Sequence, residues 1–342
     1  MKRHANIPIF IPHLGCPNNC VFCNQRTITG VGEFEIESVK RDIDKALSTI
    51  DESCEAEIAF FGGSFTGIDK ELMCKLLDIA YSYVKLGKVK SVRCSTRPDY
   101  ISKEILSILK SKGVKTIELG LQSSSDTVLS LSKRGHTFEA EIAACKMIVE
   151  FGFELVGQMM VGLPGSTLKS ELETARFIVD SGAVAARIYP TVVFRDTELC
   201  AMAECGAYTP LSLPEAVSRS AEVLKLFRDS GVNVIRIGLC ASENLSSDNT
   251  YYAGPNHAAL GELVENEYYH KLIEEEINKF FDGDASGEIT VFVSRGSLSK
   301  AIGQRKSNII RFNREYPKLI IRIFEDDTVP EHKARLTIKK GT

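Results

Sequence analysis

Short apolar runs rich in β-branched residues alternate along the chain with longer runs in which apolar residues recur every three or four positions. This alternation is typical of repeated βα units, in which helices connect parallel strands. In one of the longer runs, Ile43, Leu47 and Ile50 fall on one helical face and charged residues on the other. The predicted strands are residues 7–11, 57–61, 91–95, 116–121, 155–161 and 185–189.

Six such units predict an α/β fold, a partial (β/α)6 TIM-like barrel. A closed eight-unit barrel takes about 250 residues, and the repeating region, residues 7–237, is slightly shorter, which favours an open barrel. A doubly wound sheet gives the same pattern along the chain and stays an alternative. In both architectures the chemistry lies at the carboxyl ends of the strands.

After Gly238 the pattern changes. A polar, turn-rich segment is followed by one long helical stretch and a linker, at residues 242–254, 256–281 and 282–287. We therefore predict a barrel over residues 1–240, a helical extension over 241–282 and a small basic α+β domain over 283–342. In that last domain we expect the order β-α-α-β, with strands at 289–293 and 319–324 and helices at 298–302 and 307–313.

The composition is that of an ordinary folded protein, because 44% of the 342 residues are hydrophobic and 25% are charged. It excludes a disordered chain, collagen and a coiled coil. The formal net charge of -3 is too small to imply a polyanionic partner for the whole molecule. Residues 281–342, however, carry 12 Lys and Arg against 8 Asp and Glu, so the basic charge lies in the tail.

The sequence has no run of about 18 uncharged apolar residues. Even the best candidate, residues 148–165, contains Glu150 and Glu154, so we expect no membrane span. Pro8 and Pro12 interrupt the region that a signal peptide would keep apolar. Ten cysteines are too sparse for a disulfide scaffold and cluster near one end, which predicts a cytoplasmic protein with a metal or redox site.

Three cysteines fall within eight residues, directly after the first predicted strand, as Cys16-Pro-Asn-Asn-Cys20-Val-Phe-Cys23. Thiolates are soft ligands suited to zinc, Cu(I) and iron-sulfur clusters. Three ligands are one fewer than the usual four of a cubane cluster. One iron would then stay open, as in catalytic metal sites. The alternatives are a zinc site, with His13 or a distant cysteine as fourth ligand, and three buried free cysteines.

The loop resembles the defining motif of the radical S-adenosylmethionine (SAM) superfamily, a Cys-x3-Cys-x2-Cys loop with an aromatic residue before the last cysteine, here Phe22. Phe61-Gly-Gly-Ser-Phe-Thr66 stands where that family has a glycine-rich motif after the second strand. Glycine suits this place because a backbone without Cβ lets carbonyls approach a ligand. Other segments resemble the branch with the Elongator catalytic subunit and oxygen-independent coproporphyrinogen oxidase: Ser95-Thr-Arg-Pro-Asp-Tyr100, Glu118-Leu-Gly-Leu-Gln-Ser123, Arg134-Gly-His-Thr137, Gln158-Met-Met-Val-Gly-Leu-Pro-Gly165 and Arg187-Ile-Tyr-Pro-Thr191.

The resemblance implies a 4Fe-4S cluster on Cys16, Cys20 and Cys23, with SAM chelating the fourth iron and cleaved reductively to a 5'-deoxyadenosyl radical. It also implies an electron donor such as flavodoxin or ferredoxin. Ser95 and Gln158 stand where coproporphyrinogen oxidase relatives have acids. The implied SAM contacts are Gly62, Gly63 and Ser64 at the methionyl end, Gln122 and Arg134 at the ribose and carboxylate, and Gly162 at the adenine.

Two histidines, His136 and His257, are candidates for acid-base chemistry on a substrate, with a helix cap or a core position as the alternative. The Elongator subunit has an acetyltransferase domain after its radical domain. Nothing after residue 265 has that length or pattern, so acetyl-CoA chemistry is not expected.

Residues 299–310 resemble the loop of a KH domain, an RNA-binding module that clamps the nucleic-acid backbone through a Gly-x-x-Gly turn. Gly303 is present, but Lys306 occupies the second glycine position. A solvated basic helix face is the alternative. The candidate phosphate-binding residues are Arg305, Lys306, Arg311 and Arg314.

Together these features predict a radical SAM enzyme that acts on RNA, with tRNA favoured. One alternative is a radical SAM enzyme for a small molecule such as a porphyrin or another cofactor precursor. The other is a non-catalytic, metal-stabilised RNA-binding protein.

Overall fold

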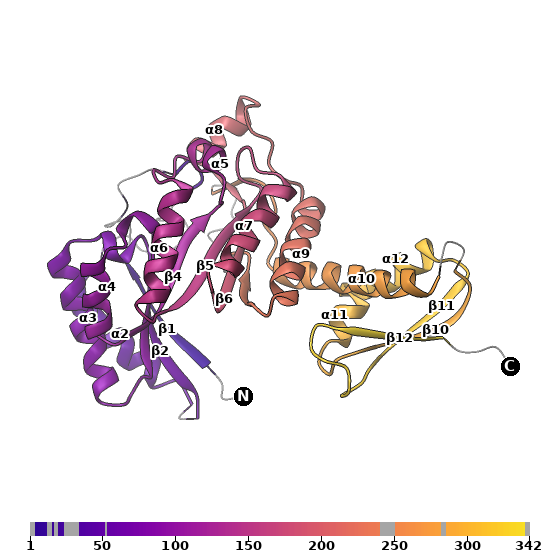
Figure 1. Cartoon of the computed structure of the whole chain (residues 1–342), viewed down its shortest axis with the longest axis horizontal. Coiled ribbons are helices and arrows are strands. Elements are labelled where there is room, and N and C mark those ends of the chain that lie inside the picture. Colours follow the sequence, from indigo (N-terminus) through magenta and orange to yellow (C-terminus); the bar gives the residue numbers. More distant parts are fainter. Residues whose placement is uncertain are drawn as a thin grey trace.

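The structure, a computed structural model, describes residues 4–11, 16, 20–23, 34–51, 53–239, 250–281 and 285–338. Its larger part is a curled sheet of seven parallel strands in the order β1-β2-β3-β4-β5-β6-β8, with helices on its outer face (Figure 1). The strands are β1 (His4–Ile11), β2 (Glu55–Gly62), β3 (Ser91–Thr96), β4 (Val114–Gln122), β5 (Glu154–Val161), β6 (Ala185–Pro190) and β8 (Asn233–Ile237).

The predicted α/β partial barrel is confirmed, and all six predicted strands are present. The structure adds a seventh strand, β8, which pairs in parallel with β6. The residues of β8 are exposed or half-buried, so β8 lacks the continuous apolar run of a buried parallel strand. Since β1 and β8 form the two edges of the sheet, the barrel is open on one side.

Amphipathic helices cover the convex face of the sheet, and most begin at a side chain that accepts a backbone N–H. At the start of α3, Asp69 Oδ1 accepts the N–H of Leu72 at 2.9 Å, a cap worth about 1 kcal/mol. The same helix turns Met73, Leu76 and Leu77, all fully buried, toward the sheet. The covering helices are α2 (Ile36–Leu47), α3 (Lys70–Lys85), α4 (Lys103–Ser111), α6 (Phe138–Glu150), α7 (Leu168–Asp180) and α9 (Leu213–Asp229).

The carboxyl ends of the strands gather at one rim, the upper one in Figure 1, where α5 and α8 also lie. This is the rim at which the sequence places the candidate chemistry. The short elements that follow the strands are η1 (Phe65–Gly67), η2 (Pro98–Tyr100), α5 (Asp126–Leu131), α8 (Glu198–Glu204) and the antiparallel pair β7 (Val193–Phe194) and β9 (Tyr251–Ala253).

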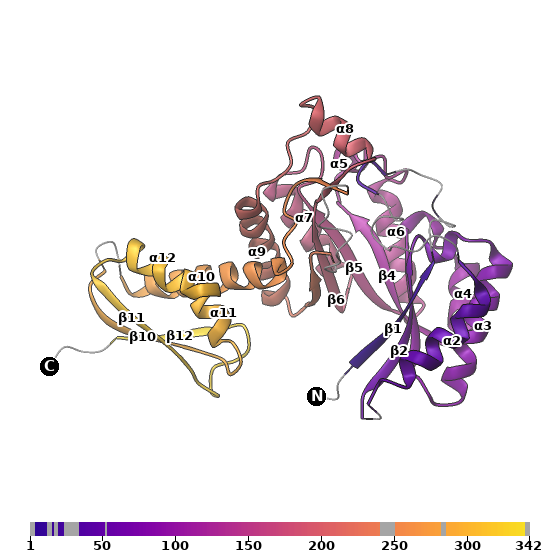
Figure 2. The same cartoon turned by 180° about the vertical axis from the view of Figure 1, so that it is seen from behind.

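A long helix, α10 (Leu260–Phe280), connects the barrel to a small domain at the other end of the molecule (Figures 1 and 2). Toward the barrel, Lys271 Nζ lies 2.6 Å from Glu222 Oε1 of α9. Toward the small domain, the Tyr269 hydroxyl donates to Ser297 Oγ at 2.8 Å. The small domain consists of β10 (Gly287–Val293), α11 (Leu298–Ile302), η4 (Gln304–Lys306), α12 (Ser307–Glu315), β11 (Leu319–Glu325) and β12 (Ala334–Ile338).

The predicted β-α-α-β order is found in the small domain, with β12 as an additional strand. The central strand β10 pairs in parallel with β11 and antiparallel with β12. The predicted boundaries at residues 240–241 and 282–283 lie outside the described residues. Among the described helices, none has the length and apolar character needed to cross a membrane.

Candidate functional site

The cysteine loop follows β1 and is held at its centre by the backbone of two distant elements. Val21, only 1% exposed, donates its N–H to the Ser132 carbonyl at 3.2 Å, and its own carbonyl accepts the Leu199 N–H at 2.8 Å. Phe22 packs beside it against a small apolar cluster that contains Leu199 and Tyr208. The loop is therefore fixed between the end of α5 and the start of α8.

Of the three predicted ligands, Cys20 is buried, and Cys16 and Cys23 are half-buried. The Cys23 N–H donates to the Cys20 carbonyl at 2.9 Å, which closes a tight turn between the last two cysteines. Within the described ranges, no three His, Cys, Asp or Glu side chains surround a position for a single metal ion. His13, the fourth ligand in the zinc alternative, lies outside the described residues.

Two buried guanidinium groups converge on Cys20. Arg134 Nη1 donates to Cys20 Sγ at 3.3 Å and Arg97 Nη1 at 3.8 Å, and the two arginines are 5% and 4% exposed. Asp99 holds the Arg97 guanidinium through two hydrogen bonds of 2.9 Å. Arg97 Nη2 also donates to the Arg134 carbonyl at 2.5 Å. Fixed positive charge and N–H donors at a cysteine sulfur favour an anionic iron-sulfur group there.

The glycine-rich turn after β2 meets the end of β1. Gly62 has a φ of +110°, and a Cβ at this position would lie 2.4 Å from the Ile11 carbonyl oxygen, so only glycine fits. The Gly63 N–H donates to the same carbonyl at 3.1 Å. Ser64, 3% exposed, places Oγ 3.4 Å from Cys16 Sγ. The motif that is predicted to contact the methionyl end of SAM therefore lies directly beside the first cysteine.

Gln122 and Arg134, both predicted SAM contacts, flank Gly120 at the end of β4. Gln122 has a φ of +73°, and the pairing register with β5 shifts here. Its Oε1 is buried and has no hydrogen-bond partner among the described residues, a condition that costs about 1–3 kcal/mol unless a ligand supplies a donor. Arg134 Nη2 donates to the Gly120 carbonyl at 2.5 Å. Both side chains thus reach the same end of the sheet as the cysteine loop.

Gly162, the predicted adenine contact, follows β5 with a φ of +84°. Its N–H donates to Glu171 Oε1 at 2.7 Å, and its carbonyl accepts the Tyr208 hydroxyl at 2.6 Å. A Cβ here would lie 2.6 Å from Leu211 Cδ1. The structure therefore requires a glycine at this position for packing, and its contact with adenine stays a prediction.

A buried ion-pair layer lies on the inner face of the sheet below these residues. Glu118, 0% exposed, accepts from Arg93 Nη1 at 2.9 Å and from Arg187 Nε at 2.8 Å. Gln158 Nε2 donates to Glu118 Oε2 at 3.0 Å and to Ser95 Oγ at 3.4 Å. The two positions that depart from coproporphyrinogen oxidase relatives therefore contact each other. A neutral amide at residue 158 avoids a second buried carboxylate beside Glu118.

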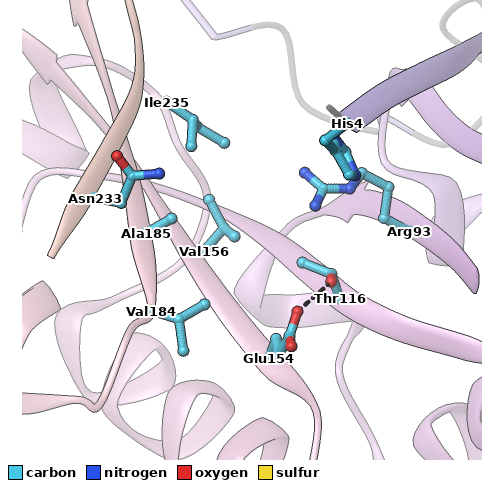
Figure 3. Close-up of a pocket in the computed structure, with 9 residues that line it drawn as sticks. All are labelled: His4, Arg93, Thr116, Glu154, Val156, Val184, Ala185, Asn233 and Ile235. Atoms are coloured by element: carbon cyan, nitrogen blue, oxygen red, sulfur yellow. Dashed lines mark hydrogen bonds between the residues drawn. The ribbon is translucent and has the colours of Figure 1, made fainter. Parts of the chain in front are cut away.

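A cavity of about 530 Å³ opens at the opposite, amino-terminal end of the strands (Figure 3). Its lining includes His4 and Arg93 on one side and Asn233 on the other, with Thr116 donating to Glu154 Oε2 at 2.9 Å. Alternate residues of β4 place Thr116, Glu118 and Gly120 successively along one face. The ion-pair layer of Glu118 thus separates this cavity from the cysteine loop.

The two candidate histidines occupy a core position and a helix start. His136 Nε2 lies 2.9 Å from Glu141 Oε1, and the two side chains are 1% and 0% exposed. Burial, followed by the charge of Arg134, lowers the pKa of His136 to about 3. Burial raises the pKa of Glu141 to about 9, so the pair is uncharged at neutral pH. His257 Nδ1 accepts the Ala259 N–H at 3.1 Å in the turn before α10, and the N-cap residue of this helix is Ala259.

Sequence motifs contain Arg97 and Glu118 but do not indicate what each of them contacts. Arg97 lies 77 positions from Cys20 in the sequence and donates to its sulfur. Glu118 accepts hydrogen bonds from side chains on three other strands. The available signal is a charged residue inside an otherwise apolar strand, as at Glu118, because such a residue is buried only when it is paired.

Two family models match the chain, one described as the radical SAM superfamily over residues 10–178 and one as the radical SAM C-terminal domain over residues 184–270. The chain belongs to the radical SAM superfamily and is an enzyme of that class, as its curled parallel sheet and cysteine loop indicate. The cofactors of this superfamily are a 4Fe-4S cluster and SAM.

Several relatives are similar over part of the chain. The uncharacterized protein MJ0486 of Methanocaldococcus jannaschii is 30% identical over 66% of this chain and 72% of its own length. The tRNA uridine(34) acetyltransferase of Methanocaldococcus infernus is 31% identical over 39% of this chain, and human Elongator complex protein 3 is 31% identical over 43%. These alignments span only 26% and 28% of those two proteins.

Among solved structures, the Elp3 of Methanocaldococcus infernus with an N-terminal deletion superimposes with a TM-score of 0.64 at 21% identity. The superposition covers 80% of this chain and 64% of that one. This likeness supports the fold.

Proposed function

We propose that the chain cleaves SAM reductively at a 4Fe-4S cluster held by Cys16, Cys20 and Cys23. When bound, the cluster and SAM supply a 5'-deoxyadenosyl radical. The observation that carries the proposal is the convergence of the cysteine loop with the turn at Gly62 and with the guanidinium groups at Cys20. The thiolates are soft ligands, the turn at Gly62 admits no side chain, and the guanidinium groups are positively charged. Together they fit a 4Fe-4S cluster and SAM.

The other residues of the site bind and orient. We assign Gly63 and Ser64 to the methionyl end of SAM because they lie between Cys16 and the end of β1. The buried, unpartnered Oε1 of Gln122 is assigned to a ribose hydroxyl. Arg134 is assigned to the carboxylate, and Gly162 to the adenine, at the ends of β4 and β5.

RNA, with tRNA favoured, is the proposed substrate. One similar protein is named a tRNA uridine(34) acetyltransferase, and the small domain carries cations suited to phosphates. Arg305 and Lys306 are exposed between α11 and α12 and have no ion pair within the described chain. Arg311 differs, because Glu267 and Glu315 hold its guanidinium at 2.7 and 2.8 Å. The cytoplasmic location and a flavodoxin-like or ferredoxin-like electron donor belong to the same proposal.

The loop of the small domain has the backbone of a glycine turn. Gly303 has a φ of +80°, and a Cβ there would lie 2.9 Å from the Asn308 nitrogen. Lys306, at the position of the second glycine in a KH loop, has a φ of +62°, a conformation that glycine adopts most readily. Positive φ angles at both residues, together with a cation at the second one, support a phosphate-binding role for this loop.

Filter binding of tRNA over a range of salt concentrations tests the RNA assignment. We expect affinity to fall steeply with salt, and the Arg305→Ala/Lys306→Ala double variant to reduce the log-log slope by about 2, since each phosphate contact contributes about 1. Lys169→Ala, an exposed lysine on α7, is the matched control. An affinity for tRNA that does not depend on salt would remove the RNA assignment and favour a small-molecule substrate.

A further inference from the structure

Two phenylalanines lie side by side on the outer face of the small-domain sheet. Phe292 of β10 pairs with Phe324 of β11, and their ring centroids are 6.5 Å apart. On the other side, β12 places Arg335 opposite Phe292, with its guanidinium carbon 5.2 Å from the Phe292 ring centroid. Phe324, Phe292 and Arg335 therefore form a row across all three strands.

This row faces away from the helices of the small domain. Ile289 and Val291, which alternate with Phe292 along β10, are fully buried on the other face. Helices α10, α11 and α12 lie on that buried side in both views (Figures 1 and 2). On the outer face, Phe324 is 49% exposed and Ile320 of the same strand is 58% exposed. We call this outer face, with Ile320, Phe324, Phe292 and Arg335, the aromatic face.

Cations border the aromatic face. Arg322 stands between Ile320 and Phe324 on β11 and pairs with Glu288 at 2.9 Å. Arg335 Nη2 donates to Asp326 Oδ2 at 2.5 Å. Arg295 is exposed in the turn after β10 and has no ion pair within the described part of the chain. The next residue in that turn, Gly296, donates its N–H to the Glu325 side chain at 2.9 Å, which holds the turn at the same end of the sheet as Phe324.

Unpaired nucleobases stack on exposed aromatic rings and on guanidinium groups. Cations beside such groups can bind the phosphates that link the bases. Exposed apolar side chains that lie together, as Ile320 and Phe324 do, also mark an interaction surface. A double helix presents no base faces, so the matching form of RNA is single-stranded.

We propose that the aromatic face binds an unpaired segment of RNA, with bases stacked on Phe324 and Arg335 and a phosphate near Arg295. Phe292 supports both stacking groups from the middle of the sheet. The inference rests on the proposed function, because it takes RNA as the substrate. It adds a second RNA contact, separate from the loop at residues 303–306.

Fluorescence anisotropy with a labelled oligouridine of about ten nucleotides and the full chain tests this inference. We expect Phe324→Ala and Phe324→Leu to raise the Kd about tenfold, because stacking is lost in both. Phe324→Tyr keeps the ring and leaves the Kd within about twofold. Phe280→Ala, which removes an aromatic residue 52% exposed at the end of α10, is the control and leaves the Kd unchanged.

A wild-type Kd for Phe324→Leu would overturn the proposal, since apolar area without a ring would then suffice, as in docking of a protein partner. Loss of dimerisation in sedimentation by Phe324→Ala, with an unchanged Kd, would also overturn it and make the face an interface between copies of the chain. A different result would contradict the proposed function. If the wild type binds no RNA, the assignment of RNA as the substrate is wrong. If RNA binding depends on Arg305 and Lys306 but not on Phe324, only the inference about the aromatic face is wrong.

Discussion

Arg134 Nη1 donates to Cys20 Sγ at 3.3 Å, and both side chains are buried. The contact joins a loop after β1 to the segment between α5 and α6, so it exists only in the folded barrel. Arg97 approaches the same sulfur, and its guanidinium is fixed by Asp99. The protein thus places Cys20 in a cationic environment that two buried guanidinium groups supply.

Replacing Arg134 with Gln is expected to shift the reduction potential of the reconstituted cluster to more negative values. The reason is that hydrogen bonds and positive charge at the sulfurs stabilise the reduced cluster. An EPR-monitored redox titration without SAM measures this shift. Lys133→Gln is the control, because this neighbouring lysine is exposed and pairs with Glu198. Equal potentials for Arg134→Gln and the wild type would contradict the assigned contact.

Gly62→Ala is expected to destabilise the barrel by more than about 2 kcal/mol, because the new Cβ combines a positive φ with a backbone clash at Ile11. Gly87→Ala is the matched control. Gly87 also has a positive φ, of +67°, but a Cβ there meets nothing within 4 Å, so only the conformational cost of about 1 kcal/mol applies. Urea unfolding compares the two variants. Equal losses of stability would show that the close approach to β1 is unimportant.

Glu118→Gln is expected to reduce the free energy of unfolding by about 3–5 kcal/mol, because the buried Arg187 would lose its carboxylate partner and Arg93 would keep only Glu57. Glu104→Gln, in an exposed pair with Lys70, should have little effect. Chemical denaturation of both variants at neutral pH checks the difference. A small loss for Glu118→Gln would mean that water reaches the ion-pair layer.

The pair His136 and Glu141 predicts a pH dependence of stability. Burial raises the pKa of Glu141 from 4.5 to about 9, so the folded state keeps a proton that the unfolded chain has released. The contribution of Glu141 to the free energy of unfolding is complete below the pKa that this carboxyl has in the unfolded chain. It is lost as the pH rises through the pKa of the carboxyl in the folded state. The lowered pKa of His136 has the opposite effect on the pH dependence. The contribution of this histidine to the free energy of unfolding is lost as the pH falls below about 6.5.

We therefore expect the free energy of unfolding to decrease between pH 7 and pH 9, and Glu141→Gln to flatten that decrease. Urea unfolding at pH 7, 8 and 9 measures the slope for each variant. Glu139→Gln, an exposed residue in the first turn of the same helix, should keep the wild-type slope. If Glu141→Gln keeps it too, the buried carboxyl does not titrate in this range.

The strands, the cysteine loop and the glycine turn were predictable because each produces a signal within a few adjacent residues. The edge strand β8 was not, because it is short, its residues are partly exposed, and Arg236 interrupts its apolar run. The contacts of Gln158 with Ser95 and Glu118 depend on the register of β3, β4 and β5, which no local pattern fixes. The contact of Arg97 with Cys20 was equally unpredictable. It forms only because the barrel brings the segment after β3 next to the cysteine loop after β1.

The most direct test of the central claim is formation of 5'-deoxyadenosine from SAM by the anaerobically reconstituted, dithionite-reduced protein. Cys20→Ala is the decisive variant, and Cys205→Ala, which removes an exposed thiol at the C-terminal end of α8, is the control. We predict that the wild type and Cys205→Ala form the nucleoside and that Cys20→Ala does not. A wild type that holds a cluster but never cleaves SAM, or a Cys20→Ala variant that still cleaves it, would contradict the account.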